Sequence, residues 1–231
     1  DFYNFANHLE DEGYNPSTIK RILSRMKFFC ARASEEGIKV SSAFTQRVFV
    51  DDDSSEIEGI YLNEQEIDDI FNLDLDHDFL LENVRWSGLR ISDFLYNLKT
   101  DNIKDGFISI KTQKTKTFVK LPIHNHIKHV LNKRFGQLPK KMSATEYNKN
   151  LKIVCQLAGI DNLVYGKIWN PEIKRKECKY LPKYSFCTSH IGRKSLCTNL
   201  AGKVPNELIQ SIFGWADSTM VAHYTKTTKT D

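Results

Sequence analysis

Amphipathic helical periodicity runs along most of this 231-residue chain, and one short alternating pattern interrupts it. Apolar residues recur at intervals of three and four near the N-terminus, in residues 19–30 and again in the C-terminal third. Between residues 107 and 122, two apolar runs flank a turn-rich Lys/Thr stretch, which predicts two short antiparallel strands. The chain is therefore expected to be mainly α with a small antiparallel β-sheet, an α+β fold.

Capping residues mark several expected helix starts. Pro16 follows Asn15 at one start, and Asn63 with Glu66 three residues later predicts a capping box at another. Either Asp217 or Ser218 can cap the last helix. The expected helices cover about residues 16–36, 77–87, 92–98, 124–135, 144–158, 189–201, 206–213 and 218–224. The stretch 166–183 is basic, contains proline and is expected to be irregular.

A polar, turn-rich stretch separates two periodic regions and indicates a domain boundary. Periodicity fails between residues 41 and 58, where three aspartates and two serines stand together. We place a linker at residues 46–59, between one domain at 1–45 and another at 60–231.

The charges are distributed unevenly along the chain. The first 105 residues carry 11 Lys and Arg against 22 Asp and Glu, whereas the remaining residues carry 22 against 7. A C-terminal half this basic suits a polyanionic partner, although a solvated basic surface gives the same count. On the helix at 16–36, cations cover much of the polar face, which fits a helix laid against phosphates or an ordinary amphipathic helix. Those expected to contact DNA are Lys20, Arg21, Arg25 and Lys27.

Cysteine usage and hydropathy limit the environment of the chain. The five cysteines are odd in number and scattered, which favours reduced thiols in a cytoplasm. Cys178, Cys187 and His190 lack the paired short spacings of a zinc site, so the two cysteines are expected to be buried thiols. No apolar run approaches the ~20 residues of a membrane helix, and no signal peptide is recognisable. A start inside an amphipathic pattern without Met predicts a fragment that lacks upstream sequence.

Three short motifs line up in a specific order. They are Ser87-Gly88-Leu89-Arg90-Ile91-Ser92-Asp93, then Ser189-His190-Ile191-Gly192-Arg193-Lys194-Ser195, then Gly214-Trp215 with Tyr224 nine residues after the tryptophan. Each is weak alone. Together with the Lys-rich hairpin, they resemble the tyrosine recombinase (phage integrase) family, and in particular integrases of mobile elements. The resemblance implies that residues 1–45 end a helical core-binding domain and that residues 60–231 form the catalytic domain.

The arginines and the histidine of these motifs suit a phosphodiester. Two guanidiniums can neutralise nonbridging oxygens bidentately, and Arg90 and Arg193 match the two arginines of the family. His190 shares a helical face with Arg193, and the resemblance implies a general base or a phosphate contact. Asp93 occupies the acidic position of the family, where it orients Arg90 or a neighbour, caps a helix or lies at the surface.

The hairpin lysines compete for one role. Lys114 matches the lysine that acts as general acid in the family, giving a proton to the departing 5′ oxygen. Lys111 and Lys116 are close rivals that are also expected to contact DNA, and a solvated hairpin tip fits any one of them as well.

Trp215 and Tyr224 complete the resemblance. Most members of the family have His where Trp215 stands, and an indole N–H can donate to a phosphate oxygen but cannot transfer a proton. Acid–base work therefore moves towards His190 and Lys114. Tyr224 matches the nucleophile, whose product is a 3′-phosphotyrosyl link and a free 5′ hydroxyl. Exchanging one phosphoester for another needs neither ATP nor a metal, and no cofactor is expected.

The resemblance also implies partners and a location. We expect double-stranded DNA, a homotetramer on two DNA sites, accessory DNA-bending proteins and a place at the bacterial nucleoid in the cytoplasm, without a membrane. The expected function is a site-specific recombinase that integrates or excises a mobile element. A relaxing type IB topoisomerase and a DNA-binding module without catalysis are the alternatives. Efficient relaxation of a supercoiled plasmid that lacks the recombination site would favour the topoisomerase. DNA transactions that Arg90→Ala leaves unchanged, while DNA binding persists, would favour the non-catalytic module.

Overall fold

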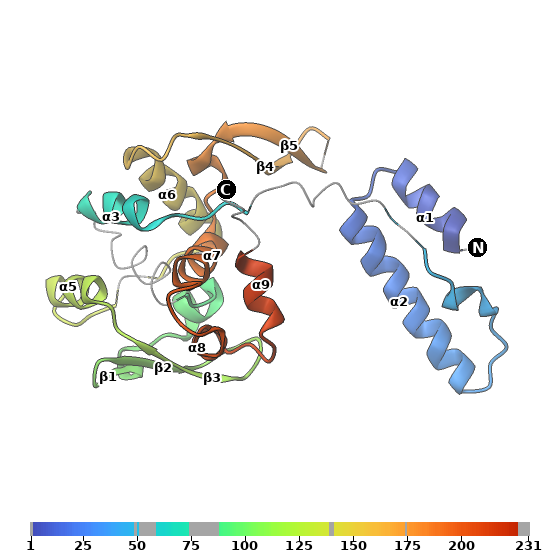
Figure 1. Ribbon diagram of the computed structural model, residues 1–231, viewed down its shortest axis with the longest axis horizontal. Helices are drawn as coiled ribbons and strands as arrows, with labels where there is room; N and C mark the ends of the chain where they lie inside the picture. The colour runs from blue at the N-terminus through green and yellow to red at the C-terminus, as the bar shows by residue number, and fades with distance from the viewer. Residues whose placement is uncertain are drawn as a thin grey trace. The chain divides into compact units, whose positions relative to one another are not determined.

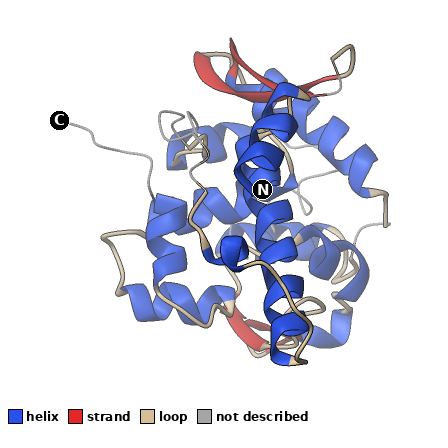
Figure 2. Ribbon diagram, turned by 90° about the vertical axis from the view of Figure 1, so that its right-hand side faces the viewer, coloured by secondary structure: helices blue, strands red, loops and turns tan. Residues whose placement is uncertain are grey.

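Helices dominate the fold, and the strands of the described residues form two small sheets (Figure 2). The computed structural model describes residues 2–48, 50, 59–73, 88–138, 141–173 and 175–225. This architecture confirms the predicted mainly α fold with small antiparallel sheets. The helix expected at 77–87 and most of the linker expected at 46–59 lie outside the described residues.

The chain divides into two compact units. The first comprises residues 1–57 together with 167–179, and the second comprises residues 58–166 together with 180–231. In the first unit, helices α1 (Phe2–Asp11) and α2 (Pro16–Glu35) precede a 3₁₀ turn at Ser42–Thr45. The residues buried between the two helices are Ala6, Leu9, Ile19 and Leu23.

The three-stranded sheet of the second unit has one buried face. Its antiparallel strands are β1 (Ile103–Lys104), β2 (Phe107–Lys111) and β3 (Phe118–Pro122). Ile108 pairs with Leu121 and Ile110 pairs with Val119, and all four side chains are buried. The alternation read from the sequence therefore identified both the strands and their inner face.

Helix α3 (Glu64–Asn72) begins at the predicted capping box. Asn63 Oδ1 accepts from the Glu66 N–H, and Glu66 Oε2 accepts from the Asn63 N–H, at 2.9 and 2.8 Å. The Glu66 carboxylate also pairs with Lys183 at 2.6 Å, in a 3₁₀ turn at Lys183–Phe186. One side chain thus caps a helix and fastens it to a segment 117 residues away.

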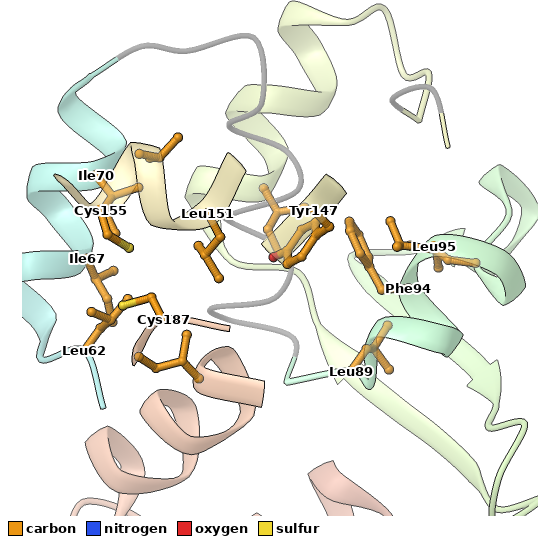
Figure 3. Close-up of a cluster of buried hydrophobic side chains, with 14 of the residues drawn as sticks. Leu62, Ile67, Ile70, Leu89, Phe94, Leu95, Tyr147, Leu151, Cys155 and Cys187 are labelled. Atoms are coloured by element: carbon orange, nitrogen blue, oxygen red, sulfur yellow. The ribbon is translucent and has the colours of Figure 1, made fainter. Parts of the chain in front are cut away.

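The main core of the second unit joins these elements. Helices α5 (Asn125–Lys133) and α6 (Ala144–Leu157) follow the sheet. Figure 3 shows side chains from α3, from the segment around Phe94 and from α6 meeting in one cluster. Cys155 and Cys187 are fully buried members of it. The cluster fixes the segment that carries Arg90 against the rest of the unit.

The stretch 166–183 corrects a prediction, because it forms strands where irregular structure was expected. Strands β4 (Leu163–Asn170) and β5 (Arg175–Pro182) make a two-stranded sheet (Figure 1). Exposed and less exposed residues alternate along β4, but Gly166 at an inner position, and Tyr165 and Trp169 at outer ones, hide that alternation from a reading based on apolar residues. Cys178, expected to be buried, is exposed on β5 and is a second correction.

Three helices close the C-terminal part of the second unit. Helices α7 (Ser189–Leu200), α8 (Asn206–Phe213) and α9 (Thr219–Thr225) pack around one small core, and β3 runs beside α8 (Figure 1). That core consists of Leu196, Cys197, Ile209, Phe213 and Val221. Among the described residues, no helix is long and apolar enough to cross a membrane.

Candidate active site

Arg90 follows a turn that only glycine can make. Gly88 has a φ of +60°, and a Cβ at this position would lie 2.4 Å from Cε1 of Phe213. Leu89 is buried in the core and holds the turn in place. The Nη1 atom of Arg90 is itself buried and has no hydrogen-bond partner among the described residues. A buried cationic donor without a partner is suited to receive an anion.

Arg193 lies on α7 and is held by main-chain carbonyls. Its Nη1 donates to Gly88 O at 2.6 Å, and its Nη2 donates to Phe213 O at 3.4 Å. The guanidinium lies 4.7 Å from the centre of the Phe213 ring, and only 3% of the residue is exposed. These contacts fix the charge at the junction of α7, α8 and the Gly88 turn.

The two arginines are close enough for their charges to interact. Burial, followed by the nearby charge of Arg90, lowers the pKa of Arg193 to about 10. Arg193 therefore stays protonated at neutral pH, while the two cations repel each other. A bound phosphate group would relieve that repulsion, which is the usual reason for two guanidiniums to share a pocket.

Tyr224 and His190 are joined by a hydrogen bond. The Tyr224 hydroxyl lies 2.9 Å from Nε2 of His190, which is on the first turn of α7. Burial of the ring, then the charges of Arg193 and Lys194, hold the pKa of His190 below its ordinary value. The imidazole is therefore neutral at neutral pH, and with its proton on Nδ1 its Nε2 can accept the tyrosine proton.

Trp215 lies between two other aromatic rings. It stacks on Phe213 with the ring centres 4.5 Å apart, and its centre lies 4.9 Å from that of Tyr224. Gly214, in the left-handed conformation at φ +61°, ends α8 and turns the chain so that Trp215 reaches this position. A Cβ on Gly214 would lie 2.8 Å from Cγ1 of Val119, so β3 also abuts this turn.

Helix α9 carries Tyr224 and is attached to α7. Thr198 Oγ1 donates to the main-chain oxygen of Tyr224 at 3.4 Å, and Val221 is buried in the small core. Asp217 Oδ1 accepts from the N–H of Thr219, the first residue of α9, at 2.8 Å. The tyrosine is therefore positioned both by its helix and by a hydrogen bond from the neighbouring helix.

The hairpin lysines differ from this cluster in their exposure to solvent. Lys114 is in the turn between β2 and β3, and Lys111 and Lys116 flank it. All three are exposed, and none of their side chains forms a hydrogen bond or ion pair with another described residue. The fold thus brings Arg90, His190, Arg193, Trp215 and Tyr224 together, and leaves Lys114 on an exposed turn.

Asp93 fastens the base of that turn. It is fully buried, and its Oδ1 accepts from the Gln113 N–H at 2.7 Å and from Asn97 Nδ2 at 3.3 Å. Asn97 Nδ2 also donates to Lys111 O at 2.7 Å. Of the alternatives for Asp93, the surface position is therefore wrong, and its hydrogen bonds hold the hairpin.

The basic residues of α2 belong to the first unit. Lys20, Arg21 and Arg25 are exposed on this helix. Lys27 differs, because its amine donates to Gln46 O and lies 6.0 Å from the centre of the Phe2 ring. Three of the four expected DNA contacts are thus exposed to solvent, and Lys27 is engaged in the packing of its own unit.

Two contributors to the site were not predicted from the sequence. Thr198 lies eight residues after His190, with Lys194 midway, so helical spacing could have placed all three on the face of α7 that meets α9. Phe213, whose ring supports both Arg193 and Trp215, looked like any apolar residue of α8. No local signal distinguishes it.

The cluster combines the elements of phosphoryl transfer at a tyrosine. The phenol of Tyr224 is hydrogen-bonded to the neutral imidazole of His190, and two guanidiniums and an indole lie beside this pair. A model of the phage integrase family matches residues 54–231. The chain belongs to this family, the tyrosine recombinases. Membership makes it a DNA strand-transferase that acts in site-specific recombination.

Structures of other recombinases share the fold. The Tn1549 transposon integrase in complex with transposon right-end DNA is 16% identical, with a TM-score of 0.73 over 100% of this chain and 81% of that one. A lambda integrase tetramer bound to a Holliday junction is 16% identical, with a TM-score of 0.66 over 100% and 65%. The XerA recombinase is 14% identical, with a TM-score of 0.56 over 98% and 77%. No curated protein sequence matches the chain significantly.

Proposed function

We propose that this recombinase cuts and rejoins DNA strands at specific sites through Tyr224, and that it integrates or excises a mobile element. The observation that carries the proposal is the 2.9 Å hydrogen bond between the Tyr224 hydroxyl and His190 Nε2. A phenol has a pKa near ~10, so attack at neutral pH needs a base at its oxygen. His190 has that place and a lowered pKa.

The cleavage step transfers one phosphoester bond. The Tyr224 oxygen attacks the phosphorus as its proton passes to His190 Nε2, and the bond from phosphorus to the 5′ oxygen breaks. The departing oxygen takes a proton from Lys114, which leaves a free 5′ hydroxyl and a 3′-phosphotyrosyl link. Attack by another 5′ hydroxyl reverses the step and joins a new strand. Neither ATP nor a metal is consumed, because the ester energy is kept in the link.

The cations stabilise the charge that develops on the phosphate. Arg90 supplies a buried Nη1 that has no hydrogen-bond partner among the described residues, and Arg193 adds a second guanidinium fixed by two carbonyls. The indole N–H of Trp215, at the position where most members of the family have histidine, can donate to a nonbridging oxygen. Preorganised donors of this kind contribute more than mobile ones, because they need no reorganisation during the reaction.

The proposed substrate is double-stranded DNA held by both parts of the chain. Residues 1–45 would belong to a core-binding domain that meets phosphates through Lys20, Arg21 and Arg25, and residues 60–231 would form the catalytic domain. Lys111 and Lys116 would contact the strand beside the cut. Assembly as a homotetramer on two sites is supported by the lambda integrase tetramer on a Holliday junction. We also propose that accessory DNA-bending proteins assist the recombinase and that it acts at the bacterial nucleoid.

A suicide substrate tests the proposal. A duplex that spans the attachment site next to the gene, nicked so that the cleaved end diffuses away, should trap a covalent adduct with the wild-type chain. Tyr224→Phe should trap none, whereas Tyr96→Phe, which removes an exposed hydroxyl elsewhere in the second unit, should react normally. An adduct formed by Tyr224→Phe, or none formed by the wild type, would refute the proposal.

A further inference from the structure

The outer half of the β4–β5 hairpin carries cations and an aromatic ring that the proposed chemistry does not use. From Leu163 to Lys183 the sequence has six Lys and Arg against two Glu. The outer half, residues 167–179, belongs to the first unit. We call this segment the hairpin arm.

Contacts along the hairpin establish which side chains share a face. The rings of Tyr165 and Tyr180 lie 5.0 Å apart across the strands at its root. Asn170 Nδ2 donates to Glu177 Oε1 at 3.0 Å. Because side chains alternate along a strand, these contacts lie on opposite faces. The face on the side of the tyrosines therefore carries, within the arm, Lys167, Trp169, Lys176 and Cys178.

This face of the arm is exposed, and both of its charged side chains are basic. Its four side chains are open to solvent, and Trp169 is 57% exposed. The acidic residue of β5, Glu177, belongs to the opposite face, where Lys179 lowers its pKa and pairs with it. No described residue on the face of Trp169 within the arm is acidic. An indole thus lies beside two lysines whose charge is not neutralised on their own face.

We propose that this face of the hairpin arm binds unpaired bases of single-stranded DNA. The indole of Trp169 stacks on a base, and Lys167 and Lys176 neutralise the phosphates on either side of it. Stacking needs the open π-face of a base, which a paired duplex conceals, while lysines suit the backbone of either form. An exposed tryptophan between lysines therefore distinguishes unpaired from paired DNA. The proposal rests on the proposed function only in taking recombining DNA as the source of such bases.

Binding of the full chain to labelled oligonucleotides tests the inference. The probes are a single strand of about 12 nucleotides, within the site size of such proteins, and a perfect duplex of the same sequence, followed by fluorescence anisotropy. Trp169→Ala should weaken binding of the single strand by about 10-fold, the loss expected for one stacked base, and leave the duplex unchanged. Phe135→Ala is the matched control, because Phe135 is 93% exposed and lies outside the hairpin.

Two further measurements separate stacking from charge. Lys167→Gln and Lys176→Gln should each reduce the salt slope of single-strand binding by about 0.7, the value for one phosphate contact. The single strand should also slow alkylation of Cys178 by iodoacetamide, which the duplex should not do. Circular dichroism and thermal unfolding identify a variant that has lost its fold.

Several outcomes overturn the inference. These are equal losses for single strand and duplex in Trp169→Ala, no loss for either in a folded variant, and an effect on self-association instead of on DNA binding. Failure of the proposed function is distinguishable, because Tyr224→Phe should bind the single strand as the wild type does. Cleavage could therefore be absent while the arm still binds unpaired bases.

Discussion

Arg193 and Lys114 are both proposed to act on the same phosphodiester, yet the fold treats them in opposite ways. Arg193 is 3% exposed and is held by two carbonyls and a ring. Lys114 is exposed on a turn and forms no hydrogen bond or ion pair with another described residue. One cation is therefore in place before DNA arrives, and the other has to be placed by it.

This difference indicates a division of labour. Arg193 is fixed in place because it is buried. Burial removes water from its guanidinium, which is unfavourable for the charge and lowers the pKa of Arg193. The hairpin turn avoids that cost, because Lys114 stays hydrated until a strand lies against it. Asp93 restricts the conformations of the hairpin turn, because it accepts a hydrogen bond from the Gln113 N–H at the start of that turn. The proposed general acid is therefore exposed in the free protein, whereas the proposed phosphate-binding Arg193 is buried.

The largest effect is expected for Arg193→Ala. Two carbonyls and the Phe213 ring lose their partner, so the unfolding free energy should fall by about 2 kcal/mol. Cleavage of the suicide substrate should fall by more than about 10³-fold, because a fixed donor to the transition state is lost. Single-turnover adduct formation and urea unfolding measure the two effects.

Arg193→Lys is the control, because lysine keeps the positive charge but lacks the planar set of N–H donors of the guanidinium. It should recover part of the stability and little of the rate. Wild-type cleavage by Arg193→Ala would show that the buried guanidinium is structural only, and the contrast with Lys114 would disappear.

Lys114→Ala comes next, with a loss of about 10²-fold in cleavage, as for removal of a general acid. Its unfolding free energy should not change, because the side chain is exposed and unpaired. A 5′-thiol leaving group needs no proton, so a substrate with sulfur at this position should restore the rate of Lys114→Ala but not that of Arg193→Ala. Lys111→Ala and Lys116→Ala are the matched controls, and rescue of either in place of Lys114→Ala would reassign the acid.

Asp93→Ala should have a smaller effect on rate. Removing the buried carboxylate leaves the Gln113 N–H without its acceptor, which should lower the unfolding free energy by about 1 kcal/mol. Cleavage should fall by about 10-fold through misplacement of Lys114, a partial loss of the contribution of a general acid. The sulfur substrate should remove this deficit too.

Asp93→Asn retains an oxygen acceptor for Gln113 and should behave closer to the wild type. A deficit in Asp93→Ala that persists with the sulfur substrate would mean that Asp93 acts on the phosphate pocket rather than on the hairpin.

The smallest effect concerns pH. Because the pKa of His190 is lowered, kcat/KM should fall only when the pH drops below the ordinary value of 6.5. Lys194→Met removes a nearby positive charge, which makes the imidazolium easier to form and raises the pKa of His190. The acidic limb should therefore move to higher pH, with equal rates at pH 8.

The same sign applies to stability. A histidine whose pKa is lowered by folding binds fewer protons in the folded state than in the unfolded state, so acid below about pH 6.5 should destabilise the fold. For the rate, an acidic limb of the kcat/KM profile that stays in place or moves to lower pH in Lys194→Met would contradict a role for His190 as the base.

The elements that the sequence predicted are those whose cause is local. The capping box of Asn63 and Glu66, the hairpin strands and the C-terminal helices depend on residues a few positions apart, and all were found. The β4–β5 hairpin was missed because its inward positions include Gly166 and its outward positions are lysines and aromatic residues. The alternation there is one of exposure and not of polarity.

For the site, the sequence by itself determined the residue types and their order. Arg90, His190, Arg193, Trp215 and Tyr224 were all named from motifs, because each motif is short and local. Only the tertiary structure decided that they meet, since Arg193 reaches Gly88 across 105 positions and Tyr224 reaches His190 across 34. The tertiary structure also decided that His190 and Arg193 are buried, which lowers the pKa of each, and that Lys114 is exposed to solvent. Contact and desolvation depend on which segments pack together, and no spacing within one segment contains that information.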